Sequence, residues 1–317
     1  MAIQATRVPS SSNKTSVTGY AHAGYAASLL EFGTPRLLPG CDGWILERAI
    51  EGSRDRDAMG CYPLFACQDW SQLPDDLENL SEDCVSLVLV TDPFGDYSEE
   101  SLQRTFRDLV IPFKEHFIVD LARTSETFIH TNHRRNARKT LATISVATCN
   151  VSESIDEWIS LYANLVARHD IRGIARFSNS AFAAQAKVPG AVMLRAIHEG
   201  RTVGMTWWFV REGVGYYHLG AYSDAGYDLG ASFGIFSRAI ELFRADGLRW
   251  LDLGAGAGLA NDAQDGLSRF KRGWSTGTRT AYLCGRILNR RRYAEIVRAK
   301  DVAATNYFPA YRTGEFG

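Results

Sequence analysis

The second half of the chain has the clearest hydrophobic patterning. Between residues 154 and 169 the apolar side chains recur at helical spacing and fall on one face, which predicts an amphipathic helix. Glu199-Gly200 and Glu212-Gly213 are short enough to be tight hairpin connections. They separate three segments with strand character, at 191–198, 201–211 and 215–222. The pattern predicts a helix followed by a three-stranded antiparallel meander.

The same half continues with alternating helix and strand patterns. A glycine-containing loop at 223–230 leads into a predicted helix at about 232–245, which ends at Gly247. A strand at 250–254, a short helix at 267–274 and a strand at 279–283 are predicted after it.

The first half has similar but weaker signals. The apolar run VSLVLVT at 85–91 predicts a buried strand, and Ser98 predicts the N-cap of a helix that reaches about residue 109. Two strands and a basic helix are predicted next, at 116–121, 144–149 and 131–141.

Antiparallel strands that feed a helix and a further strand favour a mixed α+β sheet over a doubly wound one. The 317 residues fit two domains, since a domain has roughly 100–200 residues. We expect two tandem domains at 29–150 and 151–300, each a mixed, largely antiparallel sheet flanked by helices. Residues 1–28 are rich in Ser, Thr, Ala and Gly, which predicts a flexible leader, and 301–317 would be a tail.

Composition excludes several classes of protein. The formal net charge is −1, whereas DNA-binding domains are usually strongly basic, so no DNA partner is expected. No apolar run approaches the roughly 20 residues of a membrane span. The six cysteines form no CxxC pair and match no zinc pattern, so no metal site is expected. We predict a cytoplasmic protein with reduced thiols.

A glycine-rich run offers one alternative function. The segment DLGAGAGL at 252–259 resembles the first motif of methyltransferases that bind S-adenosylmethionine. That motif normally opens a Rossmann sheet with several further strand–helix units, and the chain after Leu259 is too short to hold them. Residues 261–266 also read as loop and not as an immediate helix, so the context argues against a methyltransferase.

A second glycine-rich segment precedes the helix at 232–245. Glycines bring backbone N–H groups close to a ligand, and a helix N-terminus attracts phosphate. A plain helix cap explains the same residues equally well. The candidate cofactor-binding residues are Gly230, Ala231, Ser232, Phe233 and Gly234.

Four motifs together carry a family resemblance. They are YHLGAYSD at 217–224, RWLDLGAG at 249–256, LSRFKRGW at 267–274 and HRRNARK at 133–139. This set resembles the FemAB-type branch of the GNAT acyltransferase superfamily over residues 85–290. The resemblance implies an acyl-coenzyme A or aminoacyl-tRNA donor, an amine acceptor, and a Phe-Lys pair whose lysine, here Lys271, stabilises the developing oxyanion. The usual pyrophosphate loop begins with Arg or Gln, and Tyr227 stands in that place.

The remaining candidate site residues come from their chemistry. His218 and Asp252 are candidates for the base that deprotonates the acceptor amine, and Tyr222 for the acid that protonates the leaving group. Packing or loop capping would explain these three as well. Phosphate recognition by arginine and aromatic contacts suggest a substrate-binding set. It comprises Arg134, Arg138, Lys139, Phe270 and Trp274.

We expect an N-acyltransferase that uses acyl-coenzyme A and a small-molecule, sugar or biosynthetic amine, without a permanently bound cofactor. The near-neutral charge leans mildly toward this small donor. An aminoacyl-tRNA-dependent aminoacyltransferase is the alternative, since it uses the same fold and oxyanion chemistry. A non-catalytic binding protein on a degenerate scaffold is a further alternative, which the altered pyrophosphate loop would explain.

Overall fold

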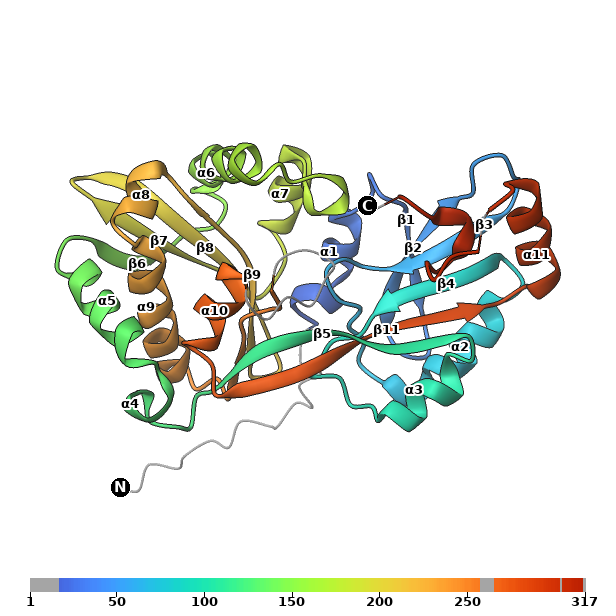
Figure 1. Cartoon of the computed structure of the whole chain (residues 1–317), viewed down its shortest axis with the longest axis horizontal. Helices are drawn as coiled ribbons and strands as arrows, with labels where there is room; N and C mark the ends of the chain where they lie inside the picture. The colour runs from blue at the N-terminus through green and yellow to red at the C-terminus, as the bar shows by residue number, and fades with distance from the viewer. Residues whose placement is uncertain (1–16, 257–264, 303, 316–317) are drawn as a thin grey trace, which may run out of the picture.

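The computed structural model describes residues 17–256, 265–302 and 304–315 (Figure 1). In this part of the chain the strands form one eleven-stranded sheet. In sheet order the strands are β1 Thr34–Leu38, β2 Gly43–Ala49, β3 Arg56–Gly60, β4 Cys84–Val90, β11 Gly277–Ile287, β5 Leu109–Asp120, β10 Trp250–Asp252, β9 Val214–Tyr222, β8 Arg201–Arg211, β7 Ala191–His198 and β6 Ser145–Cys149. Only the pairs β3–β4 and β9–β10 are parallel. The predicted mixed, largely antiparallel fold class is confirmed.

The two longest strands of the sheet centre connect the two halves of the molecule. β5 and β11 pair along nine residues of register and run from one half to the other (Figure 1). β11 also pairs with β4, and β5 with β10, so both halves share the sheet. β6 precedes the expected boundary at residue 150 but pairs with β7 beyond it. The domain boundaries at 29–150 and 151–300 stay a prediction.

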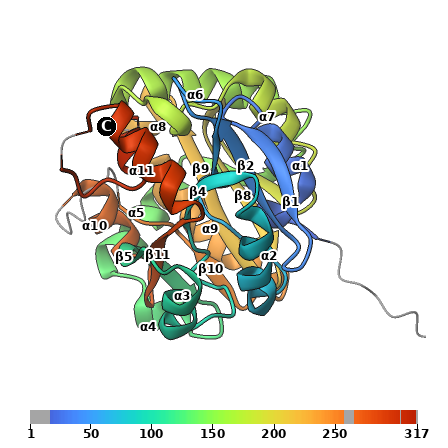
Figure 2. The ribbon, with the colours of Figure 1, turned by 90° about the vertical axis from the view of Figure 1, so that its right-hand side faces the viewer.

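Helices cover both faces of this sheet. α6 and α7 lie at the top of Figures 1 and 2, and α2 and α3 at the bottom, with strands between them. The helices are α1 Ala23–Ser28, α2 Leu73–Leu80, α3 Glu99–Thr105, α4 Ser125–Phe128, α5 Thr131–Leu141, α6 Ile155–His169, α7 Asn179–Gln185, α8 Asp224–Asp228, α9 Ala231–Ala245, α10 Gly266–Arg272 and α11 Arg290–Ala299. None of those described combines the length and apolar character needed to cross a membrane.

Successive side chains of the central strands fill two different cores. Trp207 and Tyr216 pack with the helices α1, α6 and α7 on one face. Trp208, Phe236 and Leu251 pack on the opposite face with α9 and the end of α10. Because side chains alternate across a strand, each strand contributes to both cores. This alternation decides which candidate site residues can meet.

The chain before residue 29 differs from its prediction. Tyr20 and Tyr25 are buried, and the hydroxyl of Tyr25 donates to the carbonyl of Tyr62 at 2.7 Å. Residues 17–28 therefore belong to the core and not to a flexible leader, since two aromatic anchors offset the polar composition. Residues 1–16 lie outside the described part of the chain. Near the other end, Tyr311 is buried, and its neighbour Arg312 forms an ion pair with Asp57.

Candidate functional site

The sheet opens where β9 and β10 separate. Only Val214–Tyr216 of β9 pairs with β10, although β9 continues to Tyr222. After Asp252 the chain turns away at Gly254, whose φ of +72° favours glycine. One edge of β9 is therefore left without a β10 partner from Tyr217 onward. We call the region bounded by this edge and residues 253–256 the wedge.

Lys271 lies in the wedge. Asp265 caps α10 by accepting bonds from the backbone N–H groups of Leu267 and Ser268, and Lys271 projects from the last turn of that helix. Its Nζ donates to the carbonyl of Ala255 at 2.6 Å and lies 5.4 Å from the centroid of the Tyr217 ring. Burial lowers the pKa of Lys271 to about 8, although the charges of Asp252 and Asp265 oppose the shift. The wedge thus contains a desolvated ammonium.

The glycine-rich run has a structural explanation. A Cβ on Gly254 would lie 3.2 Å from the Lys271 Nζ, and one on Gly256 would lie 2.2 Å from the Ser268 Oγ. These glycines let the chain pass close over α10. Gly258, Leu259 and the predicted loop at 261–264 lie outside the described residues. Since the sheet around β10 is mixed and not doubly wound, the methyltransferase alternative is wrong.

Asp252 has a partner that the sequence did not reveal. Its carboxylate accepts a hydrogen bond from His116 Nδ1 at 2.8 Å and another from the Gly254 N–H at 2.7 Å. Asp252 is 2% exposed and His116 8%. Asp252 thus caps the turn, which was the structural alternative to its role as a base. It also binds His116 of β5 through a hydrogen bond. His116 was hidden inside a predicted strand, because no local motif marks it.

The other two acid–base candidates lie away from Lys271. His218 Nε2 donates to the Gln185 Oε1 at 3.1 Å, and its Nδ1 accepts from the Tyr20 hydroxyl at 3.1 Å, in the core under α1 and α7. Burial lowers the pKa of His218 to about 3, so the ring is neutral. Tyr222 is buried at the far end of β9, and burial raises its pKa well above the usual range. Among the described residues neither side chain contacts Lys271, although Tyr222 interacts with Tyr217, whose ring Lys271 faces.

The candidate cofactor-binding residues all lie at the start of α9. Gly230 is the N-cap with a φ of +65°, and Ser232 is half-buried. Ala231 and Gly234 are buried, and Gly234 faces α5, where a Cβ would lie 3.2 Å from Thr140. Phe233 packs on the His133 ring at a centroid distance of 5.1 Å. Gly230, Ser232 and Phe233 are thus half-buried, whereas Ala231 and Gly234 are buried.

The candidate substrate-binding residues divide between a cleft and an aromatic cluster. Arg134 and Arg138 of α5 and Trp274 line a cleft of about 450 Å³ beside α9. Phe270 and Trp274 belong to the aromatic cluster around His133. Lys139 is exposed on α5.

α5 also holds the helix that carries Lys271. His133 Nε2 donates to the carbonyl of Phe270 at 3.0 Å, and the His130 N–H donates to the carbonyl of Gly273 at 2.9 Å. Both acceptors lie at the C-terminal end of α10, where carbonyls lack partners within the helix. α5 thus fixes the end of α10 on either side of Lys271.

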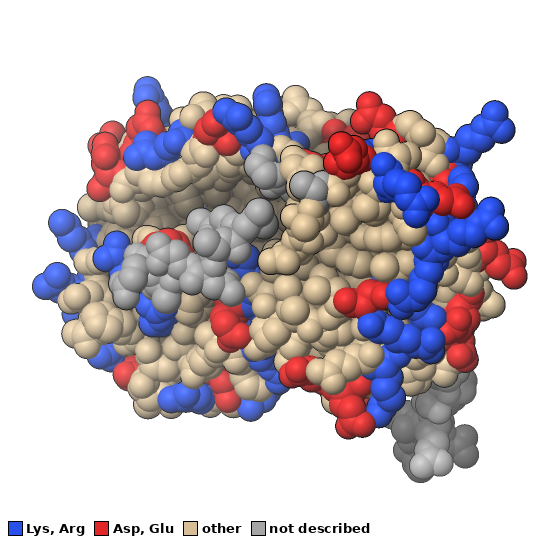
Figure 3. Space-filling view, turned by 45° about the vertical axis from the view of Figure 1, so that its right-hand side comes forward, with Lys and Arg blue, Asp and Glu red and all other residues tan. Residues whose placement is uncertain are grey.

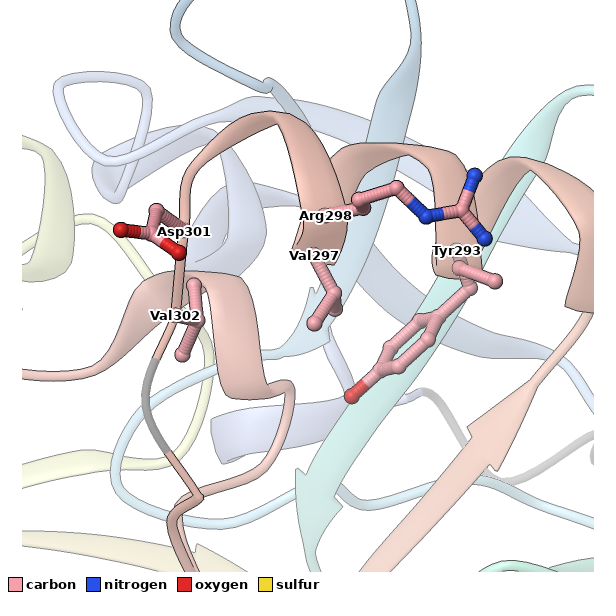
Figure 4. Close-up of a pocket in the computed structure, with 6 residues that line it drawn as sticks. Tyr293, Val297, Arg298, Asp301 and Val302 are labelled. Atoms are coloured by element: carbon pink, nitrogen blue, oxygen red, sulfur yellow. The ribbon is translucent and has the colours of Figure 1, made fainter.

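A second hollow, of about 460 Å³, lies beside α11. Figure 4 shows Tyr293, Val297 and Val302 around it, with Arg298 and Asp301 on the same segment. The hydroxyl of Tyr293 already accepts a hydrogen bond from the Ala310 N–H at 2.9 Å. None of the predicted site residues lines this hollow, so it adds nothing to the wedge.

Comparison with known proteins identifies the fold. Residues 129–272 match the family model of the acetyltransferase (GNAT) domain. No curated protein matches the chain significantly.

Three solved structures share the fold at low sequence identity. The structure of FemX is similar with 14% identity and a TM-score of 0.63, over 86% of this chain and 93% of FemX. L-PGS from Bacillus licheniformis has 13% identity and a TM-score of 0.58, over 92% and 100%. The C-terminal domain of a protein assigned as lysylphosphatidylglycerol synthetase from Agrobacterium fabrum has 14% identity and a TM-score of 0.58, over 88% and 91%. Residues 129–272 thus match the GNAT domain, the solved structures share the fold, and the resemblance to the FemAB-type branch of the GNAT superfamily is confirmed.

Proposed function

We propose that the chain is an N-acyltransferase that moves an acyl group from acyl-coenzyme A to an amine. The supporting observation is the buried ammonium of Lys271 in the wedge. Attack on a thioester builds negative charge on the carbonyl oxygen, and a preorganised cation in a desolvated site stabilises that charge strongly. The Ala255 carbonyl holds the ammonium in place before the donor arrives.

Two features of the wedge suit an extended donor. The edge of β9 beyond Tyr216 has no β10 partner, and an extended amide-containing arm can pair with such an edge. α9 begins at the Gly230 cap, where N–H groups and the helix dipole favour phosphate. Acyl-coenzyme A, a thioester, carries both an amide-containing arm and phosphates.

Aminoacyl-tRNA is the second candidate donor, because two acidic residues stand near the α9 start. Asp224 and Asp228 of α8 are exposed, and their charges disfavour a pyrophosphate there. One structural relative is assigned as a lysylphosphatidylglycerol synthetase, a name that denotes aminoacyl transfer. On the face in Figure 3, basic side chains form a band down the right-hand part, and acidic side chains border it.

A transfer assay with both donors tests the proposal. Purified protein would be supplied with labelled acetyl-coenzyme A or labelled lysyl-tRNA, and with glycinamide and glucosamine as acceptors. Lys271→Met should lower kcat about 10²- to 10³-fold, because it removes the cation that stabilises the oxyanion. The KM for the donor should change little, since the loss falls on the transition state. Lys187→Met, at an exposed lysine of the segment after α7, is the matched control.

The assays with the two donors distinguish acyl-coenzyme A from aminoacyl-tRNA as the donor of this protein. Transfer from tRNA should fall steeply with salt and weaken in Arg134→Gln/Arg138→Gln, whereas transfer from acetyl-coenzyme A should do neither. No transfer from either donor, or full activity in Lys271→Met, would contradict the proposed function.

A further inference from the structure

His116 and Asp252 form a buried pair on neighbouring strands. Asp252 stands opposite Ile118 in the β10–β5 register, so His116, two residues away, projects from the same face of the sheet. His116 Nδ1 lies 2.8 Å and 3.0 Å from the two carboxylate oxygens of Asp252. Both side chains are more than nine-tenths buried. Such a pair is costly to bury unless each group has its partner.

The bond to Asp252 selects one form of the imidazole ring. A carboxylate accepts, so Nδ1 carries the hydrogen and Nε2 of the neutral ring keeps its lone pair. Within the described residues no partner is found for Nε2, and the side chain of His116 retains some exposure. His116 is thus oriented by a carboxylate, and among the described residues its Nε2 has no hydrogen-bond partner.

Lys271 and the His116–Asp252 pair contact the same short segment. Asp252 begins it and accepts from the Gly254 N–H, while Phe117, next to His116, exchanges backbone bonds with Leu253 and Gly254. The Lys271 Nζ donates to the carbonyl of Ala255 at the other end. Lys271 reaches the wedge from the face of α10, and His116 lies on the opposite face of the sheet. Lys271 and the His116–Asp252 pair therefore border residues 252–255 from two sides, and the charge of Asp252 acts on Lys271.

We propose that His116 is the general base of the reaction and that Asp252 is its positioning residue. This inference rests on the proposed acyl transfer. As the amine nitrogen forms its bond to the donor carbonyl carbon, Nε2 takes the proton from that nitrogen. The carbonyl oxygen gathers negative charge beside Lys271. When the bond from carbon to the leaving sulfur or oxygen breaks, the leaving atom keeps the electron pair and receives the proton from Nε2.

The other basic side chains considered for the role of general base have partners of their own. Arg279 stands opposite His116 on β11, but its guanidinium lies 4.3 Å over the Phe94 ring and donates to the Pro93 carbonyl. His218 has both ring nitrogens engaged by Tyr20 and Gln185. Among the candidates in the described part of the chain, His116 alone combines a carboxylate partner, an open ring nitrogen and contact with the segment that holds Lys271.

Two acceptor amines of different basicity test the assignment. Both amines lose a proton from nitrogen as they are acylated, but glycinamide exists largely as its ammonium near neutral pH and must first lose another, so it depends on a base twice and methoxyamine once. Initial rates would be measured with acetyl-coenzyme A or lysyl-tRNA, whichever the wild type uses. The variants are His116→Gln, which can still donate to Asp252, and Asp252→Asn. His198→Gln, at a histidine bonded to the Thr143 carbonyl at 3.0 Å, is the matched control.

We expect His116→Gln to lower kcat with glycinamide about 10²- to 10⁴-fold and with methoxyamine less, since methoxyamine needs only the second of the two proton transfers. Asp252→Asn should show the same selectivity in smaller measure, because it removes the acceptor that sets the ring form. Equal losses with both amines, or full activity in His116→Gln beside an inactive Lys271→Met, would overturn the base and leave the acyl transfer standing. Wild-type protein that transfers to neither amine would overturn both proposals.

Discussion

At the scale of single residues, the site depends on one lysine kept charged in a buried place. Because burial lowers the pKa of Lys271 to about 8, its ammonium is present at neutral pH and is lost as the pH rises through that value. Oxyanion stabilisation needs the charged form. We therefore expect kcat/KM to lose the Lys271 contribution above about pH 8.

Lys271→Arg isolates this contribution, since a guanidinium stays protonated throughout the range. The ratio of wild-type to variant kcat/KM, measured from pH 6.5 to 9.5, cancels the ionisation of the acceptor amine. That ratio should be constant at neutral pH and fall about tenfold for each further pH unit well above 8. A ratio that stays constant to pH 9.5 would show that the charge of Lys271 does not limit the rate.

The sequence predicted Lys271 and Asp252 because both stand in motifs, the Phe-Lys pair and the aspartate before the glycine-rich turn. His116 has no such motif and lies far from Asp252 in sequence, so only the pairing of β5 with β10 reveals it. His218 illustrates the opposite problem. A histidine within an alternating strand gives no sign of which core it enters, and here it enters the one under α1.

At the scale of elements, α5 acts as a clamp on α10. We predict that His133→Ala lowers kcat about tenfold or more, because it frees the end of α10 and lets Lys271 shift, although no reacting group is removed. A Cβ on Gly273 would lie 2.4 Å from the His133 ring, so Gly273→Ala should displace α10 as well.

The double variant distinguishes a clamp from two separate defects. His133→Ala removes the ring that the methyl group added by Gly273→Ala would strike, so the double variant should be no worse than Gly273→Ala alone. Steady-state kinetics of the three variants, with the exposed Arg135→Ala as control, measure this. Losses that multiply would contradict a shared mechanism.

Strong periodicity explains which elements were predictable. α6 begins and ends within a residue of its predicted bounds, and both hairpins have positive φ at the expected Glu-Gly pairs. β1 to β3 and the buried segment around Tyr20 were missed, because they are short and lie in polar or glycine-containing sequence. β5 is longer than predicted, since its first half, which contains Pro112, pairs with β11 at the centre of the sheet. Tertiary pairing overrides local pattern in such places.

At the scale of the whole molecule, a buried charged pair helps join the halves. Asp92 follows β4, while Arg211 and Tyr216 come from β8 and β9. Arg211 lies 3.3 Å from the Asp92 carboxylate, and the hydroxyl of Tyr216 donates to it at 2.9 Å. Burial raises the pKa of Asp92 to about 6, and the bonds from Phe94, Arg211 and Tyr216 oppose that shift only in part.

This pKa links stability to pH. The unfolded carboxyl has a pKa of about 3.9, so the folded protein binds the Asp92 proton more tightly between about pH 4 and 6. The corresponding stability is present below pH 4 and is lost as the pH rises through 6. We expect the free energy of unfolding of the wild type to fall by about 2 kcal/mol, relative to Asp92→Asn, between pH 4.5 and 7.5. Urea titrations at several pH values measure both proteins. Asp92→Asn also changes an acceptor of the Arg211 guanidinium, which keeps Glu212 at 3.2 Å, so the evidence lies in the slope of the difference and not in its size. A difference independent of pH would mean that Asp92 ionises in the folded protein as it does in the unfolded chain.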